Sequence, residues 1–193
     1  IRDRTKEYSI DTAIRDQVLE LMAAQGPNKA CGFVGPFDAI LREGDVPAPR
    51  RVARAIRTRL PITSADELDA ATRAAKLPQR RHHPATLVFQ ALRIAVNDEF
   101  NELEAALAAS VDVLGPGGHL VVLSYHSGED RRVKQFLAQE QKGCICPPRL
   151  PVCGCGRSPR MRTLGRAQSP SPTEIRANSR ARRARLRAGA RLA

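Results

Sequence analysis

A short apolar run near the middle of the chain ends in a cluster of polar side chains. Residues 119–124 (HLVVLS) have the length and composition of a strand buried on both faces, and Tyr125, His126 and Ser127 follow it directly. In open α/β sheets, ligands bind beyond the carboxyl ends of the strands. Ser124 and His126 are therefore candidates to bind or activate a substrate. The alternative for each residue is an ordinary role in capping or packing.

A second polar group lies upstream, at the start and along one face of an expected helix. His83 and Thr86 precede or begin this helix, and Gln90, Arg93 and Asn97 are three and four residues apart, so they share a face. Amide side chains both donate and accept hydrogen bonds, which suits them to reading the edge of a base. The alternative is a helix whose exposed side is simply polar.

Four cysteines form two close pairs in a loop that contains three prolines. Cys144 and Cys146 are one pair, and Cys153 and Cys155 are the other. Thiols of a cytoplasmic protein stay reduced, and paired thiolates suit tetrahedral zinc. The one-residue gap within each pair is tighter than the usual two, so zinc and a loop of thiols without metal stand as alternatives. Cys31, far from the others, is expected to be a small buried apolar residue.

The positive charge of the chain is concentrated in its last residues. Residues 157–193, the arginine-rich segment, carry eleven arginines and one acidic residue, Glu174, and so supply ten of the twelve net charges. Arginine binds phosphate oxygens through paired donors, and neutralising phosphates releases counterions. This segment, which includes Arg180 and Arg182, indicates a nucleic-acid partner. The alternative is a solvated, disordered basic end.

Length and composition limit the class of protein. The chain has 193 residues, 42% of them hydrophobic, which suits one ordinary domain, or one domain with a small satellite. No run approaches the eighteen apolar residues of a membrane span, and the first residues lack the apolar run of a signal peptide. We therefore expect a cytoplasmic protein without a membrane partner. Because it begins at Ile1 rather than methionine, we expect a truncated chain.

The first seventy-odd residues are predicted to be wholly helical. Apolar side chains recur at helical spacing in residues 10–24, and a helix over residues 50–60 would place Val52 and Ile56 inward and five arginines outward. Proline and a basic cluster at residues 78–84 then indicate a domain boundary.

Capping patterns predict where two helices begin. Ser64 and Glu67 have the spacing of a capping box, in which each side chain accepts from the other residue's backbone, for a helix to about residue 76. Ser127 and Asp130 have the same spacing and predict a second box. In the sequence between these two predicted boxes, apolar residues at steps of three and four predict one long helix over residues 88–114. The glycines of residues 115–118 end it before the expected strand.

The sequence from about residue 50 to residue 186 resembles the RsmH/MraW family. Its longest match is residues 83–99, HPATLVFQALRIAVNDE, and residues 124–131, SYHSGEDR, resemble the family's Ser-Phe-His-Ser-Leu-Glu-Asp-Arg. Further matches follow in the family's order, namely PIT at residues 61–63, PGG at 116–118, the paired-cysteine loop, and NSRAR at 178–182. Enzymes of this family methylate the exocyclic amine of a cytidine in small-subunit ribosomal RNA.

The resemblance implies an α/β fold and an S-adenosylmethionine-dependent enzyme. We expect a partial Rossmann-like methyltransferase sheet with an inserted helical domain and a basic C-terminal tail. On this mapping, residues 1–78 are the helical substrate-recognition insert and residues 79–142 the C-terminal half of the methyltransferase domain. Residues 143–156 are then the paired-cysteine loop, and residues 157–193 are a tail that contacts RNA.

Methylating a base amine requires the base to be turned out of its stack and aligned with the donor methyl group. We expect Ser124 and His126 to line the target pocket as the catalytic residues. The residues expected to bind or read RNA are His83, Thr86, Gln90, Arg93, Asn97, Ser127, Arg131, Arg180 and Arg182.

Departures from the family pattern also carry expectations. Leu87 stands where the family usually has arginine, Gly128 replaces leucine, residues 165–168 replace a Thr-Arg-Lys-Pro-like segment, and residues 1–36 match poorly. The family's glycine-rich donor loop is expected upstream of Ile1, because residues 115–118 close a helix rather than open one. We therefore expect this chain alone to be inactive. The rival interpretations are a non-catalytic RNA-binding or ribosome-associated module and, third, a zinc-dependent adaptor.

Overall fold

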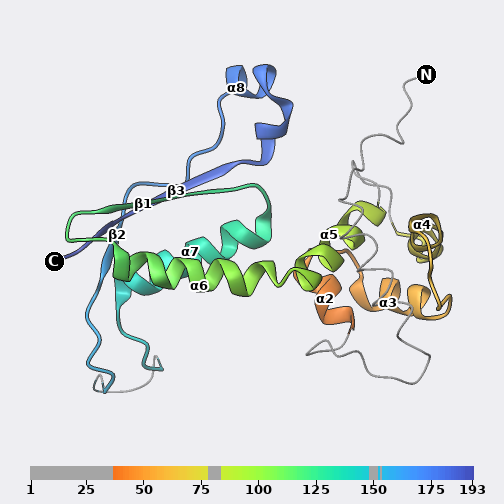
Figure 1. The fold of residues 1–193 in the computed structure, drawn as a ribbon, viewed down its shortest axis with the longest axis horizontal. Helices are drawn as coiled ribbons and strands as arrows, with labels where there is room; N and C mark the ends of the chain where they lie inside the picture. The colour runs from red at the N-terminus through yellow and green to blue at the C-terminus, as the bar shows by residue number, and fades with distance from the viewer. Residues whose placement is uncertain (1–36, 78–83, 148–151, 153) are drawn as a thin grey trace. The chain divides into compact units, whose positions relative to one another are not determined.

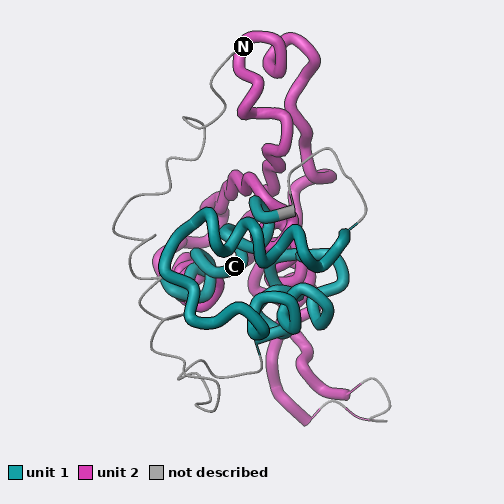
Figure 2. Tube along the Cα trace, turned by 90° about the vertical axis from the view of Figure 1, so that its right-hand side faces the viewer, with its two compact units in different colours: residues 1–99 teal, residues 100–193 magenta. Residues whose placement is uncertain are grey.

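The computed structural model describes residues 37–77, 84–147, 152 and 154–193. The chain divides into two compact units, Ile1–Glu99 and Phe100–Ala193, which Figure 2 shows in different colours. The expected helix over residues 10–24 and Cys31 lie outside the described residues. No helix in the described part of the chain is both long enough and apolar enough to cross a membrane.

The described part of the first unit is a cluster of helices, in agreement with the sequence (Figure 1). Val52 and Ile56 are fully buried in its core, whereas the five arginines of residues 50–60 face solvent. This confirms the amphipathic pattern of residues 50–60, because the apolar stripe packs inward while the charged stripe stays hydrated. The described helices are α2 (Phe37–Glu43), α3 (Pro49–Arg57), α4 (Ala65–Ala74) and α5 (Pro84–Val96).

The start of α4 agrees with the expected capping pattern in part. The Ser64 hydroxyl accepts a hydrogen bond from the Glu67 backbone N–H at 3.2 Å, as expected. The Glu67 carboxylate in turn accepts a hydrogen bond from the backbone N–H of Thr63, at 2.6 Å. The two residues therefore fix the entry of the chain into α4, with the return bond reaching one residue further than in the simple box.

The long helix predicted over residues 88–114 is wrong: it is two helices. α5 ends at Val96, and α6 (Glu99–Val113) follows after Asp98, whose φ of 52° is left-handed. Aspartate tolerates this conformation better than most residues. Apolar residues recur at helical spacing on both sides of the break, because α5 contributes to the core of the first unit and α6 contributes to the core of the second. The division after Glu99 differs from the boundary expected near residue 78, and the assignment of segments to functional domains stays a prediction.

The second unit is built on a three-stranded antiparallel sheet with the order β1-β3-β2. Its strands are β1 (His119–Ser124), β2 (Met161–Thr163) and β3 (Arg185–Arg191). α6 and α7 (Ser127–Lys142) lie on one side of the strands (Figure 1), and Val111, Val133 and Met161 are fully buried between these layers. Within the described residues the sheet is antiparallel, and the Rossmann-like details implied by the resemblance stay a prediction.

The expectation that residues 119–124 are buried on both faces is wrong. Leu120 and Val122 pack against the core of the second unit, whereas Val121 and Leu123 are 58% and 49% exposed. Successive side chains of a strand point to opposite faces, so only the face toward α6 and α7 is covered in the described structure.

The arginine-rich segment is folded, so the alternative of a disordered end is wrong. It supplies β2 and the central strand β3, and between them α8 (Pro172–Ala177) and the 3-10 helix η2 (Ser179–Arg183). β3 pairs with β1 from His119 opposite Ala190 to Ser124 opposite Arg185. The basic segment is therefore part of the core of the second unit as well as of its surface.

Candidate functional site

His126 occupies the turn between β1 and α7 and caps the helix. Its Nδ1 accepts a long hydrogen bond, 3.4 Å, from the backbone N–H of Glu129. The Glu129 carboxylate in turn accepts from the backbone N–H of Tyr125 at 2.9 Å and of His126 at 3.3 Å. The predicted capping box is therefore displaced by one residue, since Ser127 is the first residue of the helix rather than its cap.

The protonation of His126 follows from these contacts. Because Nδ1 accepts a hydrogen bond, the proton of the neutral ring is assigned to Nε2. Nε2 lies 3.1 Å from Oε1 of Glu129, but the two are not aligned for a hydrogen bond, and within the described residues this buried nitrogen has no hydrogen-bond partner. A buried donor without a partner is costly, so Nε2 is suited to an acceptor that this structure does not contain.

Glu129 holds the histidine in place as an anion. Burial raises the pKa of Glu129, but the contact with the His126 side chain and the N–H of Tyr125 outweigh it and keep the pKa below its usual range. The carboxylate is therefore charged at neutral pH. Glu129 lies within the motif SYHSGEDR, but no role for it was predicted. Its position three residues after the histidine was the available sequence signal.

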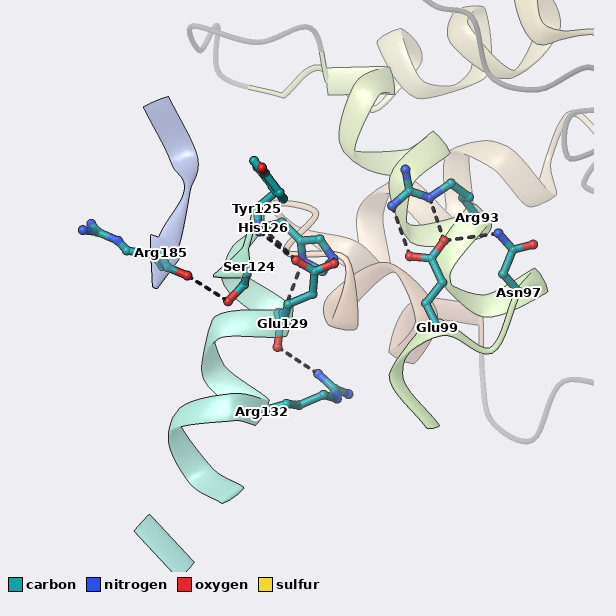
Figure 3. Close-up of polar contacts among 10 residues, drawn as sticks. Arg93, Asn97, Glu99, Ser124, Tyr125, His126, Glu129, Arg132 and Arg185 are labelled. Atoms are coloured by element: carbon teal, nitrogen blue, oxygen red, sulfur yellow. Dashed lines mark hydrogen bonds and ion pairs between the residues drawn. The ribbon is translucent and has the colours of Figure 1, made fainter. Parts of the chain in front are cut away.

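The polar residues beside His126 differ in exposure (Figure 3). Ser124 is buried, and its hydroxyl makes a weak hydrogen bond, 3.4 Å, to the Arg185 carbonyl oxygen on β3. Tyr125 is 54% exposed. Ser127 and Arg131 are exposed on α7. The structure thus brings a weakly bound hydroxyl, an exposed phenol ring and an imidazole together within three consecutive residues.

Phe100 supports the histidine from α6. Its ring centroid lies 5.7 Å from that of His126, and the Arg132 guanidinium lies 3.4 Å from the Phe100 centroid. Arg132 also donates to Glu104 at 3.0 Å. A Cβ atom at Gly128 would lie 2.6 Å from the tip of the Phe100 ring, so the glycine at this position makes room for the aromatic side chain. The roles of Phe100 and Arg132 were not predicted, because no local sequence pattern links these residues to the turn that contains His126.

The second predicted polar group forms a network within the first unit (Figure 3). Arg93 donates two hydrogen bonds to Glu99, at 2.8 and 3.1 Å, and Asn97 donates to the same carboxylate at 3.2 Å. Thr86 and Gln90 are half-buried on α5, and His83 lies outside the described residues. Glu99, for which no role was predicted, thus holds Arg93 and Asn97 together, and the RNA-binding role of these two residues stays a prediction.

Two arginines of the arginine-rich segment have structural partners. Arg187 on β3 forms a bidentate pair with Asp130 of α7, and Arg160 forms one with Glu140 at the end of α7. These pairs tie the segment to the helix that covers the sheet. Other arginines are different: Arg180, Arg182 and Arg183 are exposed and, in the described structure, form no ion pair.

Three of the four predicted metal ligands lie together. The Sγ atoms of Cys144, Cys146 and Cys155 are all within 4.8 Å of one another. Cys153 lies outside the described residues. The paired-cysteine pattern therefore corresponds to a real cluster for its described members.

The described residues do not fit a methyl-donor site. At the start of α7, the N–H groups of Tyr125 and His126 donate to the Glu129 carboxylate and that of Glu129 donates to His126. Gly117 and Gly118 donate to the Arg191 and Gly115 carbonyls, both at 2.9 Å. A nucleotide or nucleoside cradle needs such N–H groups to be open to the ligand. These two turns therefore do not form an open cradle for the donor.

Comparison with known proteins places these features in a family context. A model of the MraW methylase family matches residues 37–192. The chain is 48% identical over 157 residues to "Ribosomal RNA small subunit methyltransferase H" of Dehalococcoides mccartyi, covering 80% of this chain and 45% of the relative. For the protein of that name from Thermomicrobium roseum, identity is 50% over 155 residues, covering 78% and 48%.

A third protein of that name, from Rubrobacter xylanophilus, is 41% identical over 195 residues, covering 100% of this chain and 60% of the relative. The chain thus spans about half the length of the curated relatives that it matches.

Proposed function

The chain belongs to the MraW methylase family, and from this premise we propose that it is the target-binding part of an enzyme that methylates the exocyclic amine of a cytidine in small-subunit ribosomal RNA. The methyl donor would be S-adenosylmethionine. The observation that carries the proposal is the family match, which spans residues 37–192 and so includes both compact units. The name of the relatives, ribosomal RNA small subunit methyltransferase H, supports the substrate class.

The turn after β1 is proposed to receive the target base. A cytosine turned out of its stack presents acceptors at its ring nitrogen and carbonyl oxygen and donors at its amine. The Nε2–H of His126 lies 3.1 Å from a Glu129 oxygen but makes no aligned hydrogen bond within the described residues, and it suits the acceptor atoms of the base. The weakly bound hydroxyl of Ser124 suits the amine hydrogens. The exposed ring of Tyr125 offers a surface on which the base could stack, a contact worth about 1–3 kcal/mol per base.

RNA is proposed to be bound by side chains that lie around this turn and elsewhere in both units. The exposed guanidinium groups of Arg180 and Arg182, with no acidic partner among the described residues, suit phosphate contacts. The remaining proposed RNA contacts are His83, Thr86, Gln90, Arg93, Asn97, Ser127 and Arg131.

A chimera tests the function. The upstream half of the Thermomicrobium roseum relative is joined ahead of residue 37 of this chain, and transfer of a labelled methyl group from S-adenosylmethionine to small ribosomal subunits is measured. We expect methylation by the chimera and none by the present chain alone, because the described residues do not fit the donor. The modified base is then identified by mass spectrometry of nucleosides.

A matched variant isolates the role of His126. In His126→Asn, the amide oxygen can still accept the Glu129 N–H and cap α7, since asparagine is a preferred capping residue, but Nε2 is gone. We expect the chimera carrying His126→Asn to fold normally and to lose about 100-fold in methylation rate through misplacement of the base. Asp112→Asn, at an exposed carboxylate, is the control.

The rival function is a non-catalytic RNA-binding module, favoured by the exposed arginines Arg180, Arg182 and Arg183, which form no ion pair with any described residue. If the chimera binds both the donor and ribosomal subunits but transfers no methyl group, the enzyme proposal is wrong and the module remains. If His126→Asn does not change the methylation rate, the proposed role of His126 is wrong, whereas the enzyme proposal still holds.

A further inference from the structure

The cysteine cluster has the geometry of a metal site. The Sγ atoms of Cys144 and Cys155 are 3.8 Å apart, and that of Cys146 lies within 4.8 Å of both. In a tetrahedral zinc–thiolate site with bonds of about 2.3 Å, neighbouring sulfur atoms are separated by roughly 3.8 Å. The separation of Cys144 and Cys155 therefore equals the edge of a zinc tetrahedron, and a small movement of Cys146 completes a triangular face.

A disulfide explains the cluster less well. Sulfur atoms in a disulfide are about 2.05 Å apart, whereas Cys144, Cys146 and Cys155 are present as thiols. Any one disulfide would use two of the three and leave a thiol beside it, whereas a metal ion uses all three at once. All three side chains are half-buried, so the cluster is shielded from solvent but can still be reached by an ion.

The cluster stands on a rigid base at the end of α7. Gly143 ends the helix with a φ of 70°, and a Cβ atom there would lie 2.5 Å from the backbone nitrogen of Pro159, so the returning chain packs directly against the helix end. Arg160 donates its backbone N–H to the Glu140 carbonyl at 3.0 Å and its guanidinium to the Glu140 carboxylate at 2.6 and 2.8 Å. These bonds hold the two arms of the cysteine loop together before any metal binds.

We propose that the thiolates of Cys144, Cys146 and Cys155 bind one Zn²⁺ ion, which closes the loop between α7 and β2. Three thiolates and a divalent cation carry a net charge of about −1. Lys142 and Arg157 carry positive charges two residues from Cys144 and Cys155 along the chain, and Arg157 also lies 3.7 Å from Glu140. The ion would act structurally, because Ile145 and Val152, described apolar residues of the loop, are 52% and 76% exposed, and a metal can supply a cross-link in place of apolar packing.

Metal content and spectroscopy test the proposal without reference to methylation. The chain is purified under reducing conditions and its zinc is measured by elemental mass spectrometry; we expect about one ion per chain. Replacement by Co²⁺ should give the intense near-ultraviolet charge-transfer band of thiolate ligation. Cys144→Ser and Cys155→Ser should lose the zinc and the band, whereas the control Cys31→Ser should keep both. Absence of stoichiometric zinc and of the cobalt band from the unaltered chain would overturn the proposal.

Alkylation of the unaltered chain avoids the risk that a variant misfolds. Peptides containing Cys144, Cys146 and Cys155 should react slowly with iodoacetamide until a zinc chelator is added, and then react at least tenfold faster. Labelling of Cys31 should not change with the chelator. Equal labelling rates of the three clustered thiols before and after chelation would show that no metal protects them.

Discussion

Asp130 and Arg187 form a bidentate ion pair that ties the first turn of α7 to the central strand of the sheet, with N–O distances of 2.7 and 3.0 Å. The residues are 57 positions apart in the sequence. Both side chains are largely shielded from solvent, so the pair is screened less than a surface salt bridge. It holds in place the helix whose N-terminal cap is His126.

The pair predicts a specific dependence of stability on pH. Hydrogen bonds from Arg187 lower the pKa of Asp130 below its usual range, against the opposing effect of burial. The pair therefore stabilises the fold fully above the unfolded pKa of about 4, and this contribution is lost as pH falls through the lowered folded pKa. Asp130→Asn should reduce the free energy of unfolding at pH 7 by about 1–3 kcal/mol.

Urea denaturation at pH 7 and near pH 2 measures this effect. The difference between Asp130→Asn and the unaltered chain should shrink at the lower pH, because protonation of Asp130 removes the charge that pairs with Arg187. Asp112→Asn, at a carboxylate that is 75% exposed and 3.6 Å from Arg160, is the control and should change stability little at either pH. A difference for Asp130→Asn that stays constant with pH would contradict the assignment.

Local sequence patterns were sufficient where both partners lie within one turn of a helix. The burial of Val52 and Ile56 follows from helical spacing alone. The capping of α4 by Ser64 was also predictable, because its hydroxyl accepts from a backbone N–H only three residues away. The Asp130–Arg187 pair leaves no such signal. The two side chains meet because β3 lies beside β1, and this strand pairing arises from tertiary structure rather than from neighbouring residues.

Two errors of sequence reasoning have distinct physical causes. The cap of α7 was placed at Ser127 because histidine is an uncommon capping residue, although its Nδ1 can accept the same backbone hydrogen bond. The break between α5 and α6 was missed because the apolar spacing continues through Asp98 even though the two helices pack in different units. A residue that tolerates a left-handed conformation was the only local sign of the break.

Replacing Gly128 by alanine should have two opposing effects on the stability of the fold. Gly128→Ala should favour α7 by up to about 1 kcal/mol through helix propensity, but its Cβ would lie 2.6 Å from the Phe100 ring. Overpacking of this kind costs about 1–3 kcal/mol, and Arg132 stacked on the ring limits its escape. We therefore expect a net loss of stability in thermal denaturation. Gly115→Ala, with no atom within 4 Å of the added carbon, is the matched control.

The two faces of β1 should differ in their sensitivity to truncation. Val122 packs against the core of the second unit, and Val122→Ala should cost about 1–2 kcal/mol in the free energy of unfolding. Val121, 58% exposed on the opposite face, should tolerate the same change with a cost below about 0.5 kcal/mol. Chemical denaturation of the two variants measures the difference. Equal costs would mean that the face bearing Val121 is covered in solution.

The exposed arginines of η2 should account for part of the salt dependence of RNA binding. Removing one guanidinium–phosphate interaction lowers the slope of log affinity against log salt concentration by about 0.7 for a single-stranded RNA, and by about 0.9 for a duplex. The double variant Arg180→Gln with Arg182→Gln should therefore reduce the slope by about 1.5. Binding of the chain to a small-subunit ribosomal RNA fragment, titrated at several salt concentrations, measures the slope.

A control with the same change in net charge separates direct phosphate binding from general attraction. Arg42 and Arg73 are also exposed, but each pairs with an aspartate on its own helix, at 3.1 and 2.9 Å. Their neutralisation should weaken binding only through the overall charge and leave the slope nearly unchanged, because a guanidinium already paired with a carboxylate releases few counterions from RNA. Equal slopes for the two double variants would show that Arg180 and Arg182 contribute only to the net charge.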